Sequence, residues 1–469
     1  MGDDGQPARN PPATEVVDLA RALRRDGELR AAAALVDATL SQPEVAEPAT
    51  VPLANAAGWL LLERADLHRL GGGLTDAEHT AMAALDRFSR GGDRGGEATA
   101  ALLLGDLHSH GGQSANAAAW WGRARDLADS AGATPIGCRA LLGLLSLAAR
   151  SGSKSEATAL LDAARVRAEH GLDQALAGAE DEVRAAGSLQ TSLAHATVAL
   201  ATAGRAIATR RWAEARLIIA EVAELAERLD SSELHIEVLR LDGWLARRSG
   251  DPRSAVEALA LAGERAERSG DQRRIALLDA ERILALADNE SWAEAFELQE
   301  LAPPEAIAAQ PDVQAARLES FAVLSTRAGR LDAAERAITD AMELREAAGD
   351  LVAATRDQVQ LASLTVRGGR PQQALEMAGA AQSRAIDLGH PDIAIQAGLC
   401  AATAAAALGG RLRPVAATAR ALVQEAVAWG SAADEMAARD RLVATYLGSG
   451  DRLAARIAAD EAVTRSSEL

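Results

Sequence analysis

Apolar residues return every three or four positions along most of the chain, in segments that end at glycine or at a polar turn. The stretches LLGLLSLAAR (141–150) and ATALLDAARVRA (157–168) show this period clearly. It is the period of an α-helix that buries one face. Glycine suits the end of such a helix because it adopts the left-handed backbone conformation at little cost. The pattern predicts an all-α chain with helices of roughly 16 to 18 residues.

The helices recur in a repeat of roughly 40 residues. A glycine followed by four variable residues and an alanine marks seven copies, and weaker forms mark four more. The steps between the eleven anchor positions are 45, 40, 40, 58, 40, 40, 39, 40, 41 and 40 residues. A second set of glycines falls about half a period away, so each repeat holds two helices. The anchors are Ala32, Ala77, Ala117, Ala157, Ala215, Ala255, Ala295, Ala334, Ala374, Val415 and Ala455.

Small residues also recur at fixed distances from the anchors. They predict points of closest approach between helices, where an added side chain costs roughly 1 to 3 kcal/mol through overpacking. Twelve residues before an anchor lie Ala20, Ala65, Gly105, Ala203, Gly243, Ala322 and Ala362. Seven residues after an anchor lie Ala84, Ala124, Ala164, Ala262, Ala302, Ala341, Ala381 and Ala462, with Thr39, Val222 and Leu422 as larger exceptions.

This set of spacings resembles the tetratricopeptide repeat (TPR), in which an aromatic residue often precedes the first alanine, as Trp212 and Trp292 do here. The resemblance covers roughly residues 14 to 469. It departs in length, because the usual unit has about 34 residues, and the longer unit is similar to arrays of bacterial signal-transduction regulators. It implies an α-solenoid of about eleven TPR-like repeats that form a right-handed superhelix.

Irregular spacing divides the predicted array. Residues 1–13 are expected to be disordered, followed by about four repeats over 14–171, an extra helix or joint at 172–188, and about seven repeats over 189–469. The proline-rich segment 41–52 is expected to be a loop outside the core, and Pro303, Pro304 and Pro311 should interrupt the helices near 301–312. No polar capping helix follows the last repeat. Its end is therefore a candidate surface for self-association or partner docking, or a helix that is simply solvated.

Composition narrows the class of partner. The formal net charge of −18 and the pI near 5.0 argue against nucleic acid. No apolar stretch is long enough to span a membrane and the first residues do not form a secretory signal, so we expect neither a membrane contact nor export. The two cysteines lack a disulfide framework or metal-ligand spacing, which fits a cytoplasmic protein without cofactors.

In the TPR family the first helix of each pair lines the concave surface, so the resemblance places candidate partner-binding residues there. Together they predict a basic strip with an aromatic residue, suited to an acidic peptide or a C-terminal carboxylate. In the alternative interpretation, the arginines stabilise the helix dipole at helix ends and the tryptophan fills the core. The candidates are Arg139, Arg150, Glu237, Arg240, Trp244, Arg247, Arg248, Arg327, Arg356 and Arg367.

Other residue types offer weaker signals. The positions at which chaperone-binding TPR proteins hold a terminal carboxylate are occupied here by Asp106, Ser146, Gly204, Leu284 and Val323, which argues against that activity. His108 and His110 lack a third metal ligand at matching spacing. Cys138 and Cys400 are expected to pack in the core, and one of the adjacent Trp120 and Trp121 should point outward.

No phosphate-binding loop, catalytic triad or paired-carboxylate site is recognisable, so the sequence predicts a non-enzymatic protein. The first hypothesis is a scaffold or adaptor that binds a partner protein or extended peptide on its concave surface. The alternative is a regulatory solenoid that senses a peptide or effector and acts through a separate output protein. A helical enzyme with a distributed active site is the third.

Overall fold

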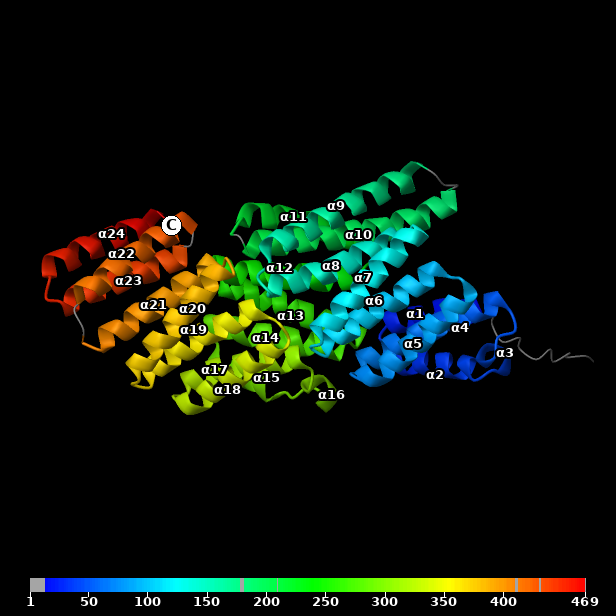
Figure 1. Ribbon diagram of the computed structural model, residues 1–469, viewed down its shortest axis with the longest axis horizontal. Helices are drawn as coiled ribbons and strands as arrows, with labels where there is room; N and C mark the ends of the chain where they lie inside the picture. Colours follow the sequence, from blue (N-terminus) through cyan, green and yellow to red (C-terminus); the bar gives the residue numbers. More distant parts are fainter. Residues whose placement is uncertain (1–12, 178–180, 209, 410–411, 430–431, 469) are drawn as a thin grey trace, which may run out of the picture.

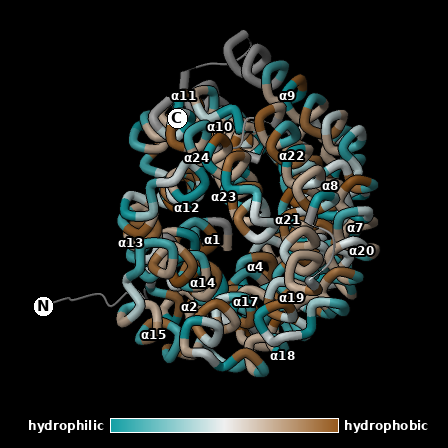
Figure 2. Tube along the Cα trace, turned by 90° about the vertical axis from the view of Figure 1, so that its left-hand side faces the viewer, coloured by the Kyte–Doolittle hydropathy of each residue, from teal (hydrophilic) through white to brown (hydrophobic). Residues whose placement is uncertain are grey.

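The computed structural model describes residues 13–177, 181–208, 210–409, 412–429 and 432–468. In this part of the chain it contains twenty-four α-helices and no strand. Eleven antiparallel helix pairs follow one another and wind into a superhelix (Figures 1 and 2). The all-α solenoid and its eleven repeats are therefore confirmed for the described residues.

The first helix of each pair lies on the inner side of the superhelix and the second on the outer side (Figure 2). The inner helices are α1 (Ala13–Arg25), α4 (Val51–Leu70), α6 (Arg94–His110), α8 (Thr134–Arg150), α10 (Asp181–Ala208), α12 (Ser232–Ser249), α14 (Gln272–Asp288), α17 (Pro311–Arg327), α19 (Leu351–Arg367), α21 (Pro391–Ala407) and α23 (Ala432–Gly448). The outer helices are α2 (Leu29–Leu40), α5 (Leu74–Gly91), α7 (Ser114–Ala131), α9 (Lys154–Ala177), α11 (Trp212–Arg228), α13 (Pro252–Ser269), α15 (Trp292–Glu300), α18 (Leu331–Ala347), α20 (Pro371–Asp387), α22 (Leu412–Trp429) and α24 (Arg452–Glu468).

The predicted small positions form the core of each pair. All eleven anchors are buried, and eight of them have no exposed side-chain surface. The residues seven positions later are buried as well, except Ala302. Ala302 is exposed because α15 ends at Glu300, just before Pro303 and Pro304. The prolines therefore interrupt the helix as predicted, and the short helix α16 (Glu305–Ala308) follows them.

Left-handed turns close many of the helices. Gly92 caps α5 with a φ of 68°, a conformation that costs glycine little. Arg210 adopts the same conformation, with a φ of 57°, in the repeat whose glycine is replaced by arginine. The repeat geometry is thus kept where the sequence signal weakens.

Two expectations about irregular segments are wrong. The segment 41–52 contributes to the core, because its short helix α3 (Pro43–Ala46) buries Val45 against Val36 and Leu60. The described parts of 172–188 form no helix of their own: residues 172–177 extend α9 and residues 181–188 begin α10. The extra residues therefore lengthen the second helix of one pair and the first helix of the next without adding an element. The division into two sets of repeats remains a prediction, and most of the N-terminal segment 1–13 lies outside the described residues.

Consecutive turns of the superhelix touch one another. Gly27, in the turn between α1 and α2, lies against the backbone of Arg268, and Gly270 lies against Leu29. The Ser114 hydroxyl donates a hydrogen bond to the carbonyl oxygen of Ala348, 234 residues away. With a repeat of about 40 residues, this separation corresponds to about six repeats per turn.

Candidate functional site

A cavity of about 1090 Å³ lies between the inner helices of the first superhelical turn and the start of the next, and we call it the chamber. Its walls are side chains of the inner helices from α1 to α14 and of the turns that precede them. The lining residues on the helices are Arg21, Trp59, Gly95, Thr99, Leu102, Thr134, Pro135, Ile136, Arg139, Leu142, Leu193, Ala194, Thr197, Leu200, Ala201, Gly204, Glu233, Leu234, Glu237, Arg240, Leu241, Trp244 and Arg274. The residues on the turns are Gly132, Ala133 and Ser231.

Apolar side chains make up one side of the chamber. Leu142 of α8 and Leu200 of α10 occupy the same repeat position on neighbouring inner helices, and Leu241 and Trp244 of α12 continue the wall. Gly204 lies between α10 and α12, and a Cβ atom there would be in van der Waals contact with Leu241 and Trp244, 3.8 Å from each. Because Gly204 lines the chamber, a larger side chain at this position would reduce its space.

Charged side chains complete the chamber, and most of them are paired. Two guanidinium nitrogens of Arg240 lie 2.6 Å and 3.4 Å from carboxylate oxygens of Glu237 and Glu281. Burial raises the pKa of Glu237, but the attraction of Arg240 outweighs it and holds this pKa below its usual value. Glu281 has a raised pKa because burial dominates there. Arg274 lies 3.6 Å from Glu233.

Arg139 is the most available cation of the chamber. Its side chain is 56% exposed and lies 3.6 Å from Asp106. Asp106 also accepts a hydrogen bond of 2.9 Å from the indole nitrogen of Trp121. Burial raises the pKa of Asp106, although Arg139 and the hydrogen bond from Trp121 oppose the shift. A carboxylate that enters the chamber would find this guanidinium accessible.

Of the ten predicted partner-binding residues, Arg139, Glu237, Arg240 and Trp244 line the chamber together. The others lie elsewhere along the inner helices. Arg247 is paired with Asp288 at 2.5 Å, and the Arg327 guanidinium stacks 4.9 Å above the centre of the Trp292 ring. Arg150 and Arg367 occupy the last turns of α8 and α19, and Arg248 and Arg356 meet at a carboxylate of α21.

That carboxylate belongs to Asp392, at the start of α21. Arg248 and Arg356 approach it to 4.0 Å and 3.8 Å, and His390 to 3.7 Å. Burial raises the pKa of Asp392, but these three partners lower it to about 2. Carboxylates thus lie within ion-pair distance of five of the eight predicted arginines, namely Arg139, Arg240, Arg247, Arg248 and Arg356, and the role of these residues in partner binding remains a prediction.

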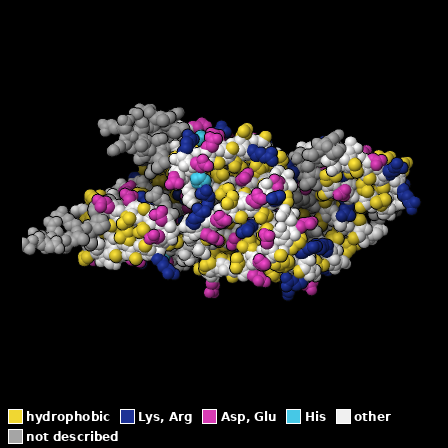
Figure 3. Space-filling model, turned by 180° about the vertical axis from the view of Figure 1, so that it is seen from behind, with side chains coloured by type: hydrophobic (Ala, Val, Ile, Leu, Met, Phe, Trp, Pro, Cys, Tyr) yellow, Lys and Arg dark blue, Asp and Glu magenta, His cyan; other side chains and the backbone are white. Residues whose placement is uncertain are grey.

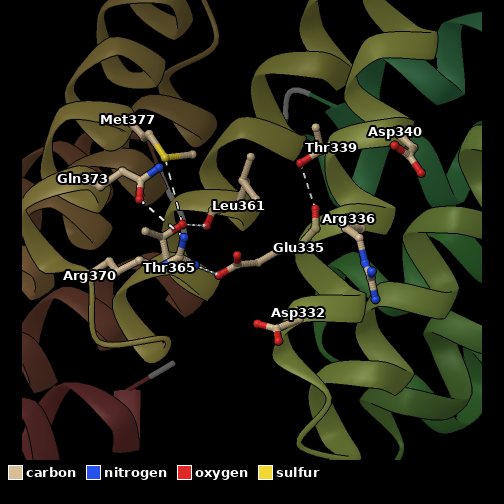
Figure 4. A pocket seen from close by; sticks show the side chains of 10 residues that line it. All are labelled: Asp332, Glu335, Arg336, Thr339, Asp340, Leu361, Thr365, Arg370, Gln373 and Met377. Atoms are coloured by element: carbon tan, nitrogen blue, oxygen red, sulfur yellow. Dashed lines mark hydrogen bonds and ion pairs between the residues drawn. The ribbon is translucent and has the colours of Figure 1, made fainter.

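The outer surface contains a smaller groove of about 400 Å³ between α18 and α20 (Figure 4). Leu361 and Thr365 of α19 form its floor, and an ion pair between Glu335 and Arg370 crosses it. Basic and acidic side chains are interspersed over the face shown in Figure 3. The chamber is the stronger candidate because it is larger and because apolar side chains from three neighbouring inner helices, α8, α10 and α12, line it.

The remaining candidates are structural. Cys138 and Cys400 are buried, and burial raises the pKa of both thiols to about 11. His108 contacts Gln113 and Glu78, and no cluster of three metal-binding side chains occurs among the described residues.

Of the two adjacent tryptophans, Trp121 is buried, whereas Trp120 is partly exposed beneath Arg123, as expected for neighbours on one helix.

Sequence reasoning missed the leucines of the chamber and Arg274. Leu102, Leu142 and Leu200 stand fifteen residues before their anchors, so one repeat position was a usable signal. Arg274 belongs to α14, one full turn after α1, and no local pattern shows that it shares a cavity with Arg21.

No protein-family model matches the chain, and no curated relative matches its sequence. Solved structures with a similar fold include a Rap protein complexed with competence and sporulation factor, at 13% identity and a TM-score of 0.49, over 88% of this chain and 100% of that chain. A signal-transduction ATPase with a tetratricopeptide repeat sensor from Pyrococcus horikoshii matches at 11% identity and a TM-score of 0.43, over 82% and 53%.

A human IFIT1 dimer with m7Gppp-AAAA matches at 13% identity and a TM-score of 0.42, over 97% of this chain and 99% of that one. At these values the similarities carry no information about a ligand or partner. Among the described residues no helix is long and apolar enough to cross a membrane.

Proposed function

We propose that the protein is a non-enzymatic scaffold or adaptor that binds an extended peptide segment of a partner protein in the chamber. The observation that carries the proposal is the partly exposed apolar lining of Leu142, Leu193 and Trp244, beside the accessible guanidinium of Arg139. A volume of about 1090 Å³ slightly exceeds the roughly 300 to 1000 Å³ of sites for single small ligands. Several consecutive peptide side chains fit such a space better than one metabolite.

The charges favour a peptide that combines apolar residues with a carboxylate. The four arginines that line the chamber outnumber its two glutamates, while the whole chain has a net charge of −18. Carboxylates of Asp106, Glu63 and Glu281 just outside the lining offset part of this positive charge, so an acidic group of the peptide would interact mainly with Arg139, the most exposed of the four arginines. Neither cysteine lines the chamber, and its carboxylates are engaged by arginines, so binding is better supported than catalysis.

A selection from a phage-displayed library of random dodecapeptides tests this proposal. In the variant Gly204→Leu, the new side chain fills the space beside Trp244 without changing a charge. The matched control is Gly263→Leu on α13, where nothing lies within 4 Å of an added Cβ atom. We expect the selected peptides to bind Gly204→Leu at least tenfold more weakly than the wild type and to bind Gly263→Leu normally. Equal binding to all three proteins would refute the chamber as the site.

A further inference from the structure

Contacts between consecutive superhelical turns recur along the coil, between connecting turns and helix ends. Besides the pairs at Gly27 and Ser114, Gly152 lies against Leu388, and Gly389 against Lys154. Arg210, in the turn before α11, forms an ion pair of 3.0 Å with Asp434 at the start of α23. We call this line of contacts the seam.

The seam differs from the packing within each turn. Within a turn, neighbouring helices pack along their lengths, whereas across the seam only helix ends and connecting turns meet. Two polar contacts stand out there, the Ser114 hydrogen bond and the Arg210–Asp434 pair. A boundary of this kind opens at lower cost than a helix–helix interface, because less apolar surface is exposed.

The chamber lies across the seam. Arg21 of α1 and Trp59 of α4 line it from the beginning of the first turn, and Arg274 of α14 lines it from the beginning of the next. These residues share one cavity because the α1–α2 turn rests on the α13–α14 turn, where Gly270 meets Leu29. If the seam opened, Arg21 and Trp59 would move away from Arg274.

We propose that the seam gates the chamber: the coil opens and closes along the turn-to-turn contacts, and only the closed coil forms the complete binding site. This inference rests on the proposed function, since it describes how the same chamber is assembled. Opening leaves each helix pair intact, so the movement is a change of superhelical pitch. Peptide binding and seam closure then favour each other.

Charge reversal at the seam provides the first test. In Arg210→Glu a carboxylate faces Asp434, and in the double variant Arg210→Glu/Asp434→Arg the pair is restored with exchanged signs. Arg253→Glu is the control, because Arg253 is exposed and forms an ion pair with Glu257 on its own helix. Small-angle X-ray scattering measures the radius of gyration, and the anionic apolar dye 8-anilinonaphthalene-1-sulfonate serves as the probe of the chamber.

We expect Arg210→Glu to increase the radius of gyration and to weaken dye binding at least threefold. The double variant should restore both values, and Arg253→Glu should change neither. Dye binding must also fall in Gly204→Leu, which shows that the dye occupies the chamber. An unchanged radius of gyration in Arg210→Glu would overturn the gating proposal, whereas unchanged dye binding in Gly204→Leu would count against the chamber itself.

A reversible crosslink provides the second test. A Cβ atom on Gly349 would lie 4.0 Å from the Cβ atom of Ser114, within the range of disulfide bonds. Ser114→Cys/Gly349→Cys should therefore form a disulfide under mild oxidation. Ser114→Cys/Gly369→Cys is the matched control, because Gly369 has a similar φ, 76° against 74°, but has nothing within 4 Å. The native cysteines are buried and should remain reduced.

The two tests combine in the triple variant Arg210→Glu/Ser114→Cys/Gly349→Cys. Its oxidised form should be compact and should bind the dye as the wild type does, and reduction with dithiothreitol should reverse both properties. If the crosslink forms and oxidised and reduced proteins bind the dye equally, the seam does not control the chamber. Failure of the crosslink to form would show that the two turns do not meet in solution.

Discussion

The Arg240 guanidinium on α12 lies 3.4 Å from the Glu281 carboxylate on α14, 41 residues further along the chain. The same step of 41 residues joins Arg247 to Asp288. One repeat plus one residue thus brings opposite charges together on neighbouring inner helices. The inner surface consequently presents paired charges, and Arg139 is the most exposed of the four arginines that line the chamber.

The helix packing predicts that substitution by alanine has opposite effects on stability at Gly105 and Gly122. A Cβ atom on Gly105 would lie 2.4 Å from the Trp121 ring, whereas nothing lies within 4 Å of one on Gly122. Gly105→Ala should destabilise the protein by about 1 to 3 kcal/mol through overpacking. Gly122→Ala should stabilise it by about 0.5 to 1 kcal/mol because alanine favours the helix. Shifts of the urea unfolding midpoint in opposite directions would support the packing, and equal shifts would contradict it.

The repeat could be predicted from the sequence because of such close contacts between helices. Alanine and glycine at the anchor and flanking positions are imposed by backbone approach, so the sequence records them directly. Val45 was misplaced because a proline-rich segment resembles a loop even when one of its side chains is buried.

The pairing of Arg240 with Glu281 could not be predicted from the pattern within one helix, because the two residues lie 41 positions apart on neighbouring inner helices. The seam depends on the superhelical pitch, which no local pattern determines.

Asp357 on α19 predicts a specific pH dependence. Its carboxylate is fully buried and lies 2.5 Å from Arg345, which also binds Glu319. Burial dominates and raises the pKa of Asp357 to about 7. The native state therefore holds a proton that the unfolded state releases near its ordinary pKa of about 4. This group makes the protein less stable as the pH rises from about 4 to about 7.

Replacement by asparagine removes that proton exchange. The stability of Asp357→Asn relative to the wild type should therefore increase as the pH rises from about 4 to about 7, and should stay constant above it. Urea unfolding at closely spaced pH values measures the difference, with Asp332→Asn, an exposed carboxyl on α18, as control. If the difference in free energy of unfolding between the wild type and Asp357→Asn does not vary with pH, the raised pKa of Asp357 is ruled out.

Site-specific photocrosslinking tests the central claim most directly. The photoreactive residue p-benzoylphenylalanine is placed at Leu142 inside the chamber or at Leu217, which is 73% exposed on the outer helix α11. After irradiation in host cells, adducts are identified by mass spectrometry. We predict a partner peptide attached at position 142, lost when Gly204→Leu is added, and no such adduct at position 217. The same partner captured at 217 and absent at 142 would contradict binding in the chamber.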